Sequence, residues 1–475
     1  MPQQITKRLV FLFCILFFSN NIFAQIDSAF NNTTSDTIIV KKIILSGNEK
    51  TKEHIIYREF IFHENDTLSR RVFEAAVKRT KENLLNTFLF NFVDIEYVTD
   101  NNFHTVVTVE LAERWYLWPI PIFELVDRNF NEWWQTQDFS RTNFGLNLSQ
   151  QNFRGRKESL NVITRFGFDQ NFGILYSVPY INKNQKTGFR VGFNYFQSKE
   201  VNYNVIDNKL VSVRTDEDFV FRQVYSGMRF SHRIRHNNSL SAALEYRYTK
   251  VRDTLVQLNS EYLLPNTDRQ KLLVFSIRYQ IDSRDSKSYP LKGDLARLSL
   301  VKQGFGALEN EPDHTYAFLI YKHHHELGNR LNLSGSVAAK LSDGKRISYF
   351  NSRALGYENF FVRGYELYVI NGQHFSLFKS NLKYNLVKER VYHLKWLPSK
   401  KFNKVPLAFY VNAYSDFAYV HDNYFESTNP LANEWINGFG AGIDFVTYYD
   451  LVTRFDYSIN KFGDKAFFIH FRAPI

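Results

Sequence analysis

The chain has 475 residues, a formal net charge of +11 and an aromatic content of 17%. No apolar run reaches the roughly 20 residues that cross a bilayer as a helix, so a helical membrane protein is excluded. The positive charge would suit nucleic acid, but the N-terminus indicates export, so no nucleic-acid partner is expected.

An export signal is predicted at the N-terminus. A basic pair and an apolar run at 9–18 precede Ala24, a small residue at the expected cleavage point. The signal is expected to cover residues 1–24 and a polar linker residues 25–36. Cys14, the only cysteine, lies in the signal, so we expect no disulfide and no cysteine-bound metal in the mature chain.

Residues 37–113 are expected to form a small α+β domain. Asn65, Asp66 and Thr67 should break the chain between its two helices. Apolar residues alternate in the strands and recur at helical spacing in the helices. The elements, in βααββ order, are a strand at 37–45, helices at 51–60 and from Ser69 onward, and strands at 91–98 and 104–112.

Short motifs in this domain occur in a fixed order: Gly47-Asn48, then Thr51, Ile55, Ile56, Arg58 and Glu59, then Asp66-Thr67-Leu68. Together they resemble a POTRA domain of the BamA superfamily. The resemblance implies a periplasmic docking module that offers a sheet edge to unfolded or secreted client chains, by adding a strand to the sheet. A plug or a spacer is the alternative.

The remainder, residues 115–475, is predicted to be a transmembrane β-barrel. Segments of about ten residues alternate, and mean hydropathy is low at -0.35 despite the aromatic content. Lipid outside and water inside require this pattern. At about 22 residues per strand and connection, roughly 16 antiparallel strands are expected. A soluble β-sandwich or propeller is the alternative, but its exposed face would not hold Phe, Leu and Tyr so consistently. In 188–196, for example, one face carries Phe189, Val191, Phe193 and Tyr195, and the other carries Arg190, Gly192 and Asn194.

The connections between the expected strands alternate between short and long. Barrels of this kind have short periplasmic turns and longer outer loops, which fixes the orientation. The segment 387–406 is the exception, because it should be periplasmic yet is long and basic. The short connections include 153–157, 181–186, 235–238 and 327–330, and the long ones 199–216, 251–268, 304–313, 342–372 and 420–434.

The longest outer loop contains Val362, Arg363, Gly364 and Tyr365, preceded by a Gly-containing segment at 354–359. This motif is similar to the Val-Arg-Gly-Phe/Tyr motif of the BamA/TamA-type assembly and translocation superfamily. The resemblance implies that the loop folds back into the lumen and that Arg363 meets acidic residues of the barrel wall. Further ordered matches are Gly145-Leu146-Asn147, Asn152-Phe153-Arg154-Gly155, Asp282-Ser283-Arg284-Asp285, Tyr289-Pro290-Leu291-Lys292-Gly293 and Gly438-Phe439-Gly440-Ala441-Gly442.

Strand parity identifies two candidate partners of Arg363. Asp416 lies on the face opposite Phe417, and Asp444 on the face opposite Ile443, so both carboxylates should point into the lumen. A guanidinium offers a rigid fork of donors to a carboxylate. We expect Arg363 to pair with Asp416, Asp444 or both; separately solvated charges are the alternative.

The seam between the first and last strands is a candidate weak point. Pro119 and Pro121 lie on the first strand, and Pro474 follows the last. Proline removes a donor from the ladder, so a short, weak seam is expected. In the superfamily that the chain resembles, this seam is the proposed lateral gate. The prolines would equally suit simple strand ends.

No enzymatic signature is found, and neither a cofactor nor a metal site is expected. In the run 323–326, His323 and His325 share a strand face but His324 does not, which leaves too few ligands for a metal site. The glycines at 438–442 are followed by no helix that would complete a dinucleotide site.

The expected function is assistance in inserting client proteins into the outer membrane or translocating them across it, with the first domain in the periplasm. Client chains and outer-membrane lipids are the expected partners, and accessory proteins are left open. A passive solute pore and a dedicated two-partner secretion channel are the alternatives.

Overall fold

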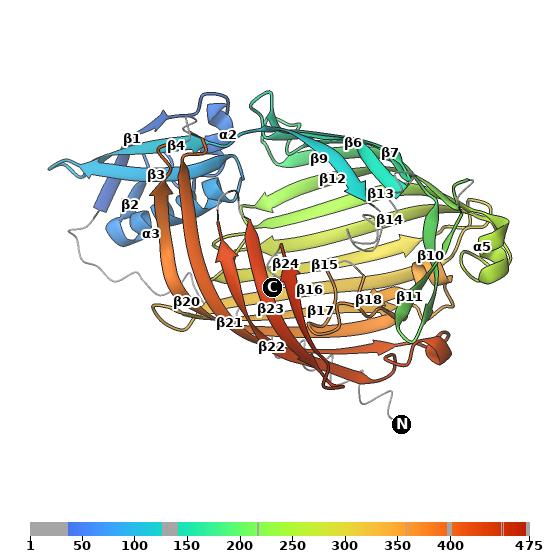
Figure 1. The fold of residues 1–475 in the computed structure, drawn as a ribbon. Helices are drawn as coiled ribbons and strands as arrows, with labels where there is room; N and C mark the ends of the chain where they lie inside the picture. The colour runs from blue at the N-terminus through green and yellow to red at the C-terminus, as the bar shows by residue number, and fades with distance from the viewer. Residues whose placement is uncertain are drawn as a thin grey trace.

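The computed structural model describes residues 37–125, 141–215, 218–357, 359–396, 401–447, 449 and 451–471. The expected signal and linker, and Pro474, lie outside the described residues. A small α+β domain sits at one end of a large curved sheet (Figure 1). We call the barrel end next to this N-terminal domain the domain end, and the opposite end the far end.

The N-terminal domain has the expected mixed fold, with one strand more than predicted. Its sheet has the order β2-β1-β4-β3, in which β1 and β4 run parallel. Fully buried apolar residues of both helices and of the sheet form one core, including Ile38, Ile56, Phe73 and Leu84. The elements are β1 (Thr37–Ser46), α2 (Glu53–Tyr57), β2 (Thr67–Ser69), α3 (Arg70–Leu85), β3 (Phe90–Thr99) and β4 (His104–Glu113).

Two local expectations for this domain were wrong. Thr67 does not belong to a break: it pairs with Ile39, so that β2 forms an antiparallel edge of the sheet. Three residues are too few for alternation to reveal a strand. The first helix begins only at Glu53, because the backbone N–H of Thr51 donates to the carboxylate of Glu113 at 2.7 Å and holds the chain outside the helix.

Over its described residues, the barrel is one sheet of 16 strands, as the count of alternating segments predicts. All neighbouring strands in the order from β24 to β5 are antiparallel. The strands are β5 (Leu117–Leu125), β6 (Thr142–Phe153), β7 (Glu158–Gly167), β8 (Asp169–Val178), β9 (Thr187–Ser198), β12 (Phe221–Arg235), β13 (Asn238–Val251), β14 (Arg269–Asp282), β15 (Gly293–Gln303), β16 (His314–Glu326), β17 (Leu331–Ser342), β20 (His374–His393), β21 (Lys404–His421), β22 (Trp435–Val446), β23 (Val452–Asn460) and β24 (Lys465–His470).

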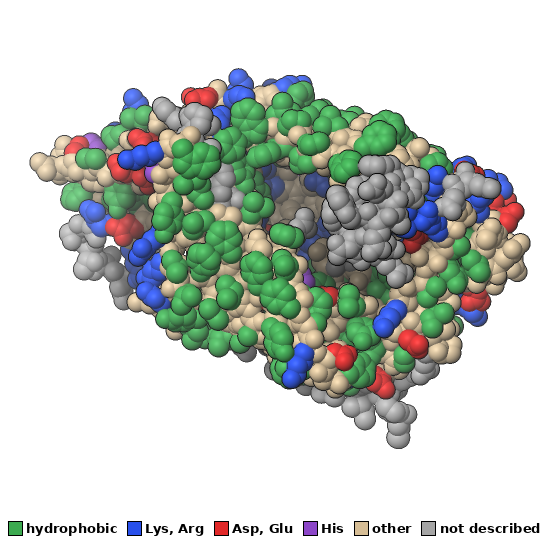
Figure 2. All heavy atoms as spheres, viewed as in Figure 1, with side chains coloured by type: hydrophobic (Ala, Val, Ile, Leu, Met, Phe, Trp, Pro, Cys, Tyr) green, Lys and Arg blue, Asp and Glu red, His purple; other side chains and the backbone are tan. Residues whose placement is uncertain are grey.

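The two faces of this sheet reverse the usual arrangement of a soluble protein. Ile443 and Phe417 are 48% and 44% exposed on the outer face, whereas Asp444 and Asp416 are 0% exposed on the inner face. Hydrophobic side chains cover the outside of the barrel over several strands (Figure 2). Such a large apolar surface requires hydrocarbon around it.

No described helix has both the length and the apolar character needed to cross a membrane.

The connections have the alternating lengths expected from the sequence. Those at the domain end are mostly tight, such as the two-residue link between β12 and β13. At the far end, β7 and β8 are joined by one residue and β23 and β24 by four, but four longer connections carry additional elements. These are the hairpin β10 (Glu200–Ile206) and β11 (Lys209–Arg214), the helix α5 (Asp253–Leu258), the turns η2 (Tyr349–Asn351) and η3 (Glu426–Thr428), and the short pair β18 (Arg353–Leu355) and β19 (Ile370–Asn371).

The segment 387–406, which breaks the alternation of lengths, extends the β20–β21 hairpin. The ladder continues as far as His393, which pairs with Lys404. This ribbon reaches the N-terminal domain (Figure 1), where the side chain of Asn91 donates to the carbonyl of Lys401 at 3.2 Å. Its basic residues therefore lie beside the domain.

Candidate functional site

The loop between β17 and β20 folds back from the far end into the barrel. The side chains of Val362 and Tyr365 are buried, and they pack in one cluster with Ala418 of β21 and Ile436 of β22. The hydroxyl of Tyr365 accepts a hydrogen bond from the backbone N–H of Lys461 at 3.1 Å. Both side chains therefore hold the motif against the wall formed by the last strands.

Arg363 is completely buried and pairs with Asp416 of β21. Its Nε donates to Oδ2 of Asp416 at 2.8 Å, and its backbone N–H donates to the same oxygen at 3.1 Å. Its Nη2 donates both to Oδ1 of Asp416 and to the carbonyl of Ser380, the latter at 3.0 Å. The guanidinium carbon also lies 3.8 Å from the ring centre of Tyr414. A forked, charge-assisted pair of this kind fixes the loop in one orientation.

Two glycines allow the motif to approach the wall. Gly364 has a φ of 93°, a conformation that favours glycine. At Gly438 of β22, a Cβ would overlap the carbonyl oxygen of Arg363. The loop backbone therefore occupies the space that any other side chain at position 438 would fill.

Asp444 belongs to a second buried centre. Its carboxylate pairs with Arg454 of β23, and it accepts hydrogen bonds from the hydroxyl of Tyr289 at 2.6 Å and from the amide of Asn412 at 3.0 Å. Over the described residues, no hydrogen bond or ion pair joins Asp444 to Arg363. Of the two acidic candidates, only Asp416 therefore pairs with Arg363 of the motif. Asp444 forms its ion pair with Arg454 instead.

Neither Arg454 nor Tyr289 was expected from the sequence to contact Asp444, although signals for both exist. Arg454 shares its strand face with Asp456 and lies opposite Phe455, so the parity argument used for Asp444 also places it in the lumen. Tyr289 stands in the Tyr-Pro-Leu-Lys-Gly motif at the turn before β15.

The lumen wall beside the motif is basic. Nζ of Lys379 lies 3.9 Å from Oδ2 of Asp416 and 4.2 Å from the ring centre of Phe361. Nζ of Lys383 lies 4.5 Å from the ring centre of Tyr289. Both lysines are buried. These two lysines and the two arginines face three buried carboxylates, those of Asp416, Asp444 and Asp456, the last of which lies 3.9 Å from Arg454.

The two end strands of the sheet, β5 and β24, are not joined by a ladder over their described residues. In Figure 2 the molecule is hollowed on the side where β24 ends the sheet, with basic side chains visible inside. Each end strand thus leaves one row of backbone donors and acceptors free of a strand partner in the sheet.

Pro119 and Pro121 lie in β5, opposite Leu148 and Leu146 of β6. The β5–β6 ladder is continuous at all nine positions of β5. Because alternate residues of a strand donate to the same neighbour and proline has no N–H, the donors of β5 in this ladder must come from the alternate set that includes Ile120. The two missing donors consequently belong to the free edge of β5.

Residues 152–471 match the family model described as the Omp85 superfamily domain, and residues 38–114 match the model described as POTRA, surface antigen variable number repeat. No curated protein matches the chain.

Three of the solved structures that match the chain are the following. CdiB from Escherichia coli has a TM-score of 0.50 at 13% identity, over 94% of this chain and 92% of that one. BamA from Haemophilus ducreyi lacking POTRA domains 1–3 has a TM-score of 0.48 at 15% identity, over 89% and 81%. CdiB from Acinetobacter baumannii has a TM-score of 0.49 at 12% identity, over 91% and 73%.

Proposed function

Because the chain belongs to the Omp85 superfamily, we propose that it is an outer-membrane protein that assists the insertion of client proteins into that membrane or their translocation across it. The N-terminal domain and the domain end of the barrel then lie in the periplasm, and the far end faces outward. The free edges of β5 and β24 are the observation that carries the proposal.

The seam between these edges offers a template to a client strand. The edge of β24 contains no proline, so it has a donor and an acceptor at each alternate residue. The edge of β5 lacks the donors of Pro119 and Pro121, which weakens any pairing of β5 with β24. An incoming client strand therefore competes only with weak pairing between β5 and β24. Replacing that pairing by pairing with the client needs no nucleotide or cofactor.

The N-terminal domain supplies a second edge. β3 is the last strand of its sheet and has ten residues, whereas β2 at the other edge has three. Addition of a client segment to β3 would use main-chain hydrogen bonds and thus tolerate many sequences. The free edge of β3 and the seam would then act in succession on the same client.

A passive pore is the second candidate, and the basic lumen wall favours it. Lys379 and Lys383 would attract anions. Against it stands the Arg363 loop, which is fixed inside the barrel by Asp416. An open pore would require this buried pair to separate.

Depletion of the protein, followed by quantitative profiling of the outer-membrane and secreted proteins, tests the proposal. A broad loss of outer-membrane β-barrels supports a role in insertion, and the loss of one or a few secreted proteins supports translocation. Unchanged protein levels combined with altered uptake of anionic solutes would favour the pore.

A cross-link across the seam separates a moving gate from a static one. Cysteines at Phe123 of β5 and Phe467 of β24, joined by a flexible bismaleimide, should abolish the rescue of depleted cells. The control joins cysteines at Phe123 and Phe144, which already face each other in the β5–β6 ladder, and it should retain rescue. Full rescue by the seam-linked protein would contradict gating at this seam.

A further inference from the structure

A cavity of about 530 Å³ lies between the N-terminal domain and the domain end of the barrel. Its lining contains ten Lys and Arg residues but only two acidic ones, Glu59 and Asp282. The cations come from the domain, from the turns at the domain end and from the inner wall of the barrel. A partly enclosed space lined by one sign of charge concentrates counter-ions.

Both acidic residues of the lining are already neutralised by neighbours. Glu59 accepts two hydrogen bonds from the guanidinium of Arg233, at 3.0 and 2.8 Å, and its carboxylate lies 3.4 Å from Arg58. Asp282 forms a forked pair with Arg284 at 2.8 and 2.9 Å. Each carboxylate is therefore already paired with arginine, although Glu59 also attracts Lys157 and Asp282 also attracts Lys287.

Five cations of the lining form no ion pair with any carboxylate in the part of the chain that the structure describes. Arg190 and Arg278 lie on barrel strands and contact only serine hydroxyls, at 3.5 and 3.3 Å. The other three are lysines of three separate turns at the domain end. They are Lys157, Lys186 and Lys287.

Lys157 illustrates the unfavourable electrostatics of the cavity. Burial lowers the pKa of its ammonium group to about 8, and the positive charges of Lys287, Arg58 and Arg233 act in the same direction against the attraction of Glu59. Burial also lowers the pKa of Lys287. A bound anion would remove this penalty from several groups at once.

We propose that this cavity binds a small, water-soluble anion carrying phosphate groups. Guanidinium forks and ammonium groups are the donors that phosphate oxygens prefer, and the volume is that of a small-molecule site. Only Val178, Pro179 and Phe189 in the lining are apolar, which leaves little surface for an acyl chain. Because the cations belong to both parts of the molecule, the anion would tie the N-terminal domain to the barrel.

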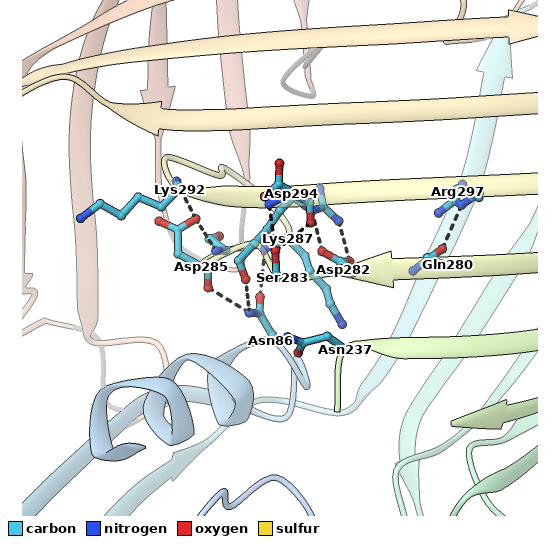
Figure 3. A network of polar contacts seen from close by, with 12 residues as sticks. Asn86, Asn237, Gln280, Asp282, Ser283, Asp285, Lys287, Lys292, Asp294 and Arg297 are labelled. Atoms are coloured by element: carbon cyan, nitrogen blue, oxygen red, sulfur yellow. Dashed lines mark hydrogen bonds and ion pairs between the residues drawn. The ribbon is translucent and has the colours of Figure 1, made fainter. Parts of the chain in front are cut away.

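The contacts around the cavity support this bridging role. The guanidinium of Arg79 donates to the side-chain oxygen of Asn237 at 3.1 Å. The amide of Asn86 donates to the carbonyl of Asp285 at 2.9 Å (Figure 3). Both contacts join α3 to turns at the domain end. Anion binding in this cavity does not depend on whether the barrel inserts client proteins, exports them or conducts solutes. Its test is therefore separate from that of the proposed function.

Calorimetric titration of the full chain in phosphatidylcholine nanodiscs with inorganic pyrophosphate, at constant ionic strength, tests the proposal. We expect saturable binding accompanied by proton uptake, because the anion raises the pKa of Lys157. The double variant Lys157→Gln/Lys287→Gln should weaken binding at least tenfold. Lys183→Gln, the same substitution at an exposed lysine outside the lining, should leave it unchanged.

The titration of the unaltered protein keeps the proposal falsifiable even if the double variant does not fold. Absence of saturable pyrophosphate binding there would overturn it, as would equal affinities of the double variant and Lys183→Gln. Loss of pyrophosphate binding when phosphatidylglycerol replaces phosphatidylcholine would assign the site to a lipid headgroup and overturn the assignment to a soluble anion.

Discussion

Arg363, at the tip of the long far-end loop, and Asp416, on β21, form a forked ion pair in which both side chains are completely buried. The two residues are 53 positions apart in the chain. Their pairing converts a long connection into an internal part of the barrel. It also sets the geometry of the wall next to the last strands, because Gly438 and Lys461 contact the same loop.

Replacing Arg363 by Ala should lower the free energy of unfolding by up to about 3–5 kcal/mol, because the buried carboxylate of Asp416 loses its forked partner and keeps only Lys379, whose Nζ lies 3.9 Å away. Arg363→Lys should also destabilise, since an ammonium cannot form the fork. Urea unfolding monitored by tryptophan fluorescence measures the change. Arg346→Ala is the control: this exposed arginine of the same loop pairs with Glu261, and a surface pair contributes at most about 1 kcal/mol. Equal stability of Arg363→Ala and Arg346→Ala would exclude a locking role for the pair.

Gly438→Ala should displace the loop without removing any charged group. The added Cβ would overlap the carbonyl oxygen of Arg363, and forcing extra volume into packed structure costs about 1–3 kcal/mol. Hydrogen exchange of the backbone around 362–365 should become faster. Gly335→Ala, on β17, adds the same group where nothing lies within 4 Å and should not change the exchange. Unaltered exchange in Gly438→Ala would show that the loop is not held by this contact.

Alternation along the chain was sufficient to predict the barrel and the inward direction of Asp416 and Asp444. It did not decide between them as partners of Arg363, because that choice depends on where the loop enters the lumen. Parity also places Arg454 inside, but only the register of β22 and β23, in which Asp444 faces Arg454, explains why Asp444 is occupied. Contacts across strands thus follow from register, which the pattern of one strand does not contain.

The junction between the N-terminal domain and the barrel was not predictable from local patterns. Glu59 and Arg233 are 174 positions apart, and each is an ordinary charged residue in its own segment. Their contact depends on how two folded units dock. The same applies to the β20–β21 ribbon, whose basic residues and Pro406 have the composition of a loop but continue a ladder.

Arg233→Ala should loosen the N-terminal domain from the barrel. The variant leaves Glu59 buried with only Arg58 within ion-pair distance among the described residues. Loss of hydrogen bonds to a charged group costs about 1.5–3 kcal/mol, so hydrogen exchange in α2 and the adjoining turn should increase. Arg235→Ala, an exposed residue at the end of the same strand, is the matched control. Equal protection of α2 in both variants would indicate that other contacts alone hold the domain.

Acidification should weaken the same junction through Glu59. Burial alone would raise the pKa of this carboxyl, but the charges of Lys157, Arg233 and Arg58 outweigh it and lower the pKa from 4.5 to about 2. A carboxyl whose pKa is lower when folded contributes stability that is complete above the unfolded pKa, and this contribution is lost as the pH falls through the folded value.

The window for this loss therefore extends from about pH 4.5 down to about pH 2. Hydrogen exchange of α2, compared with that of the barrel strands after correction for the intrinsic rate at each pH, should show protection of the domain falling in this interval. Glu59→Gln carries no titrating proton, so its protection should be lower at neutral pH and should not fall further through this group. If the protection of α2 falls with pH in parallel in Glu59→Gln and in the unaltered protein, the loss of protection comes from other carboxyl groups and not from protonation of Glu59.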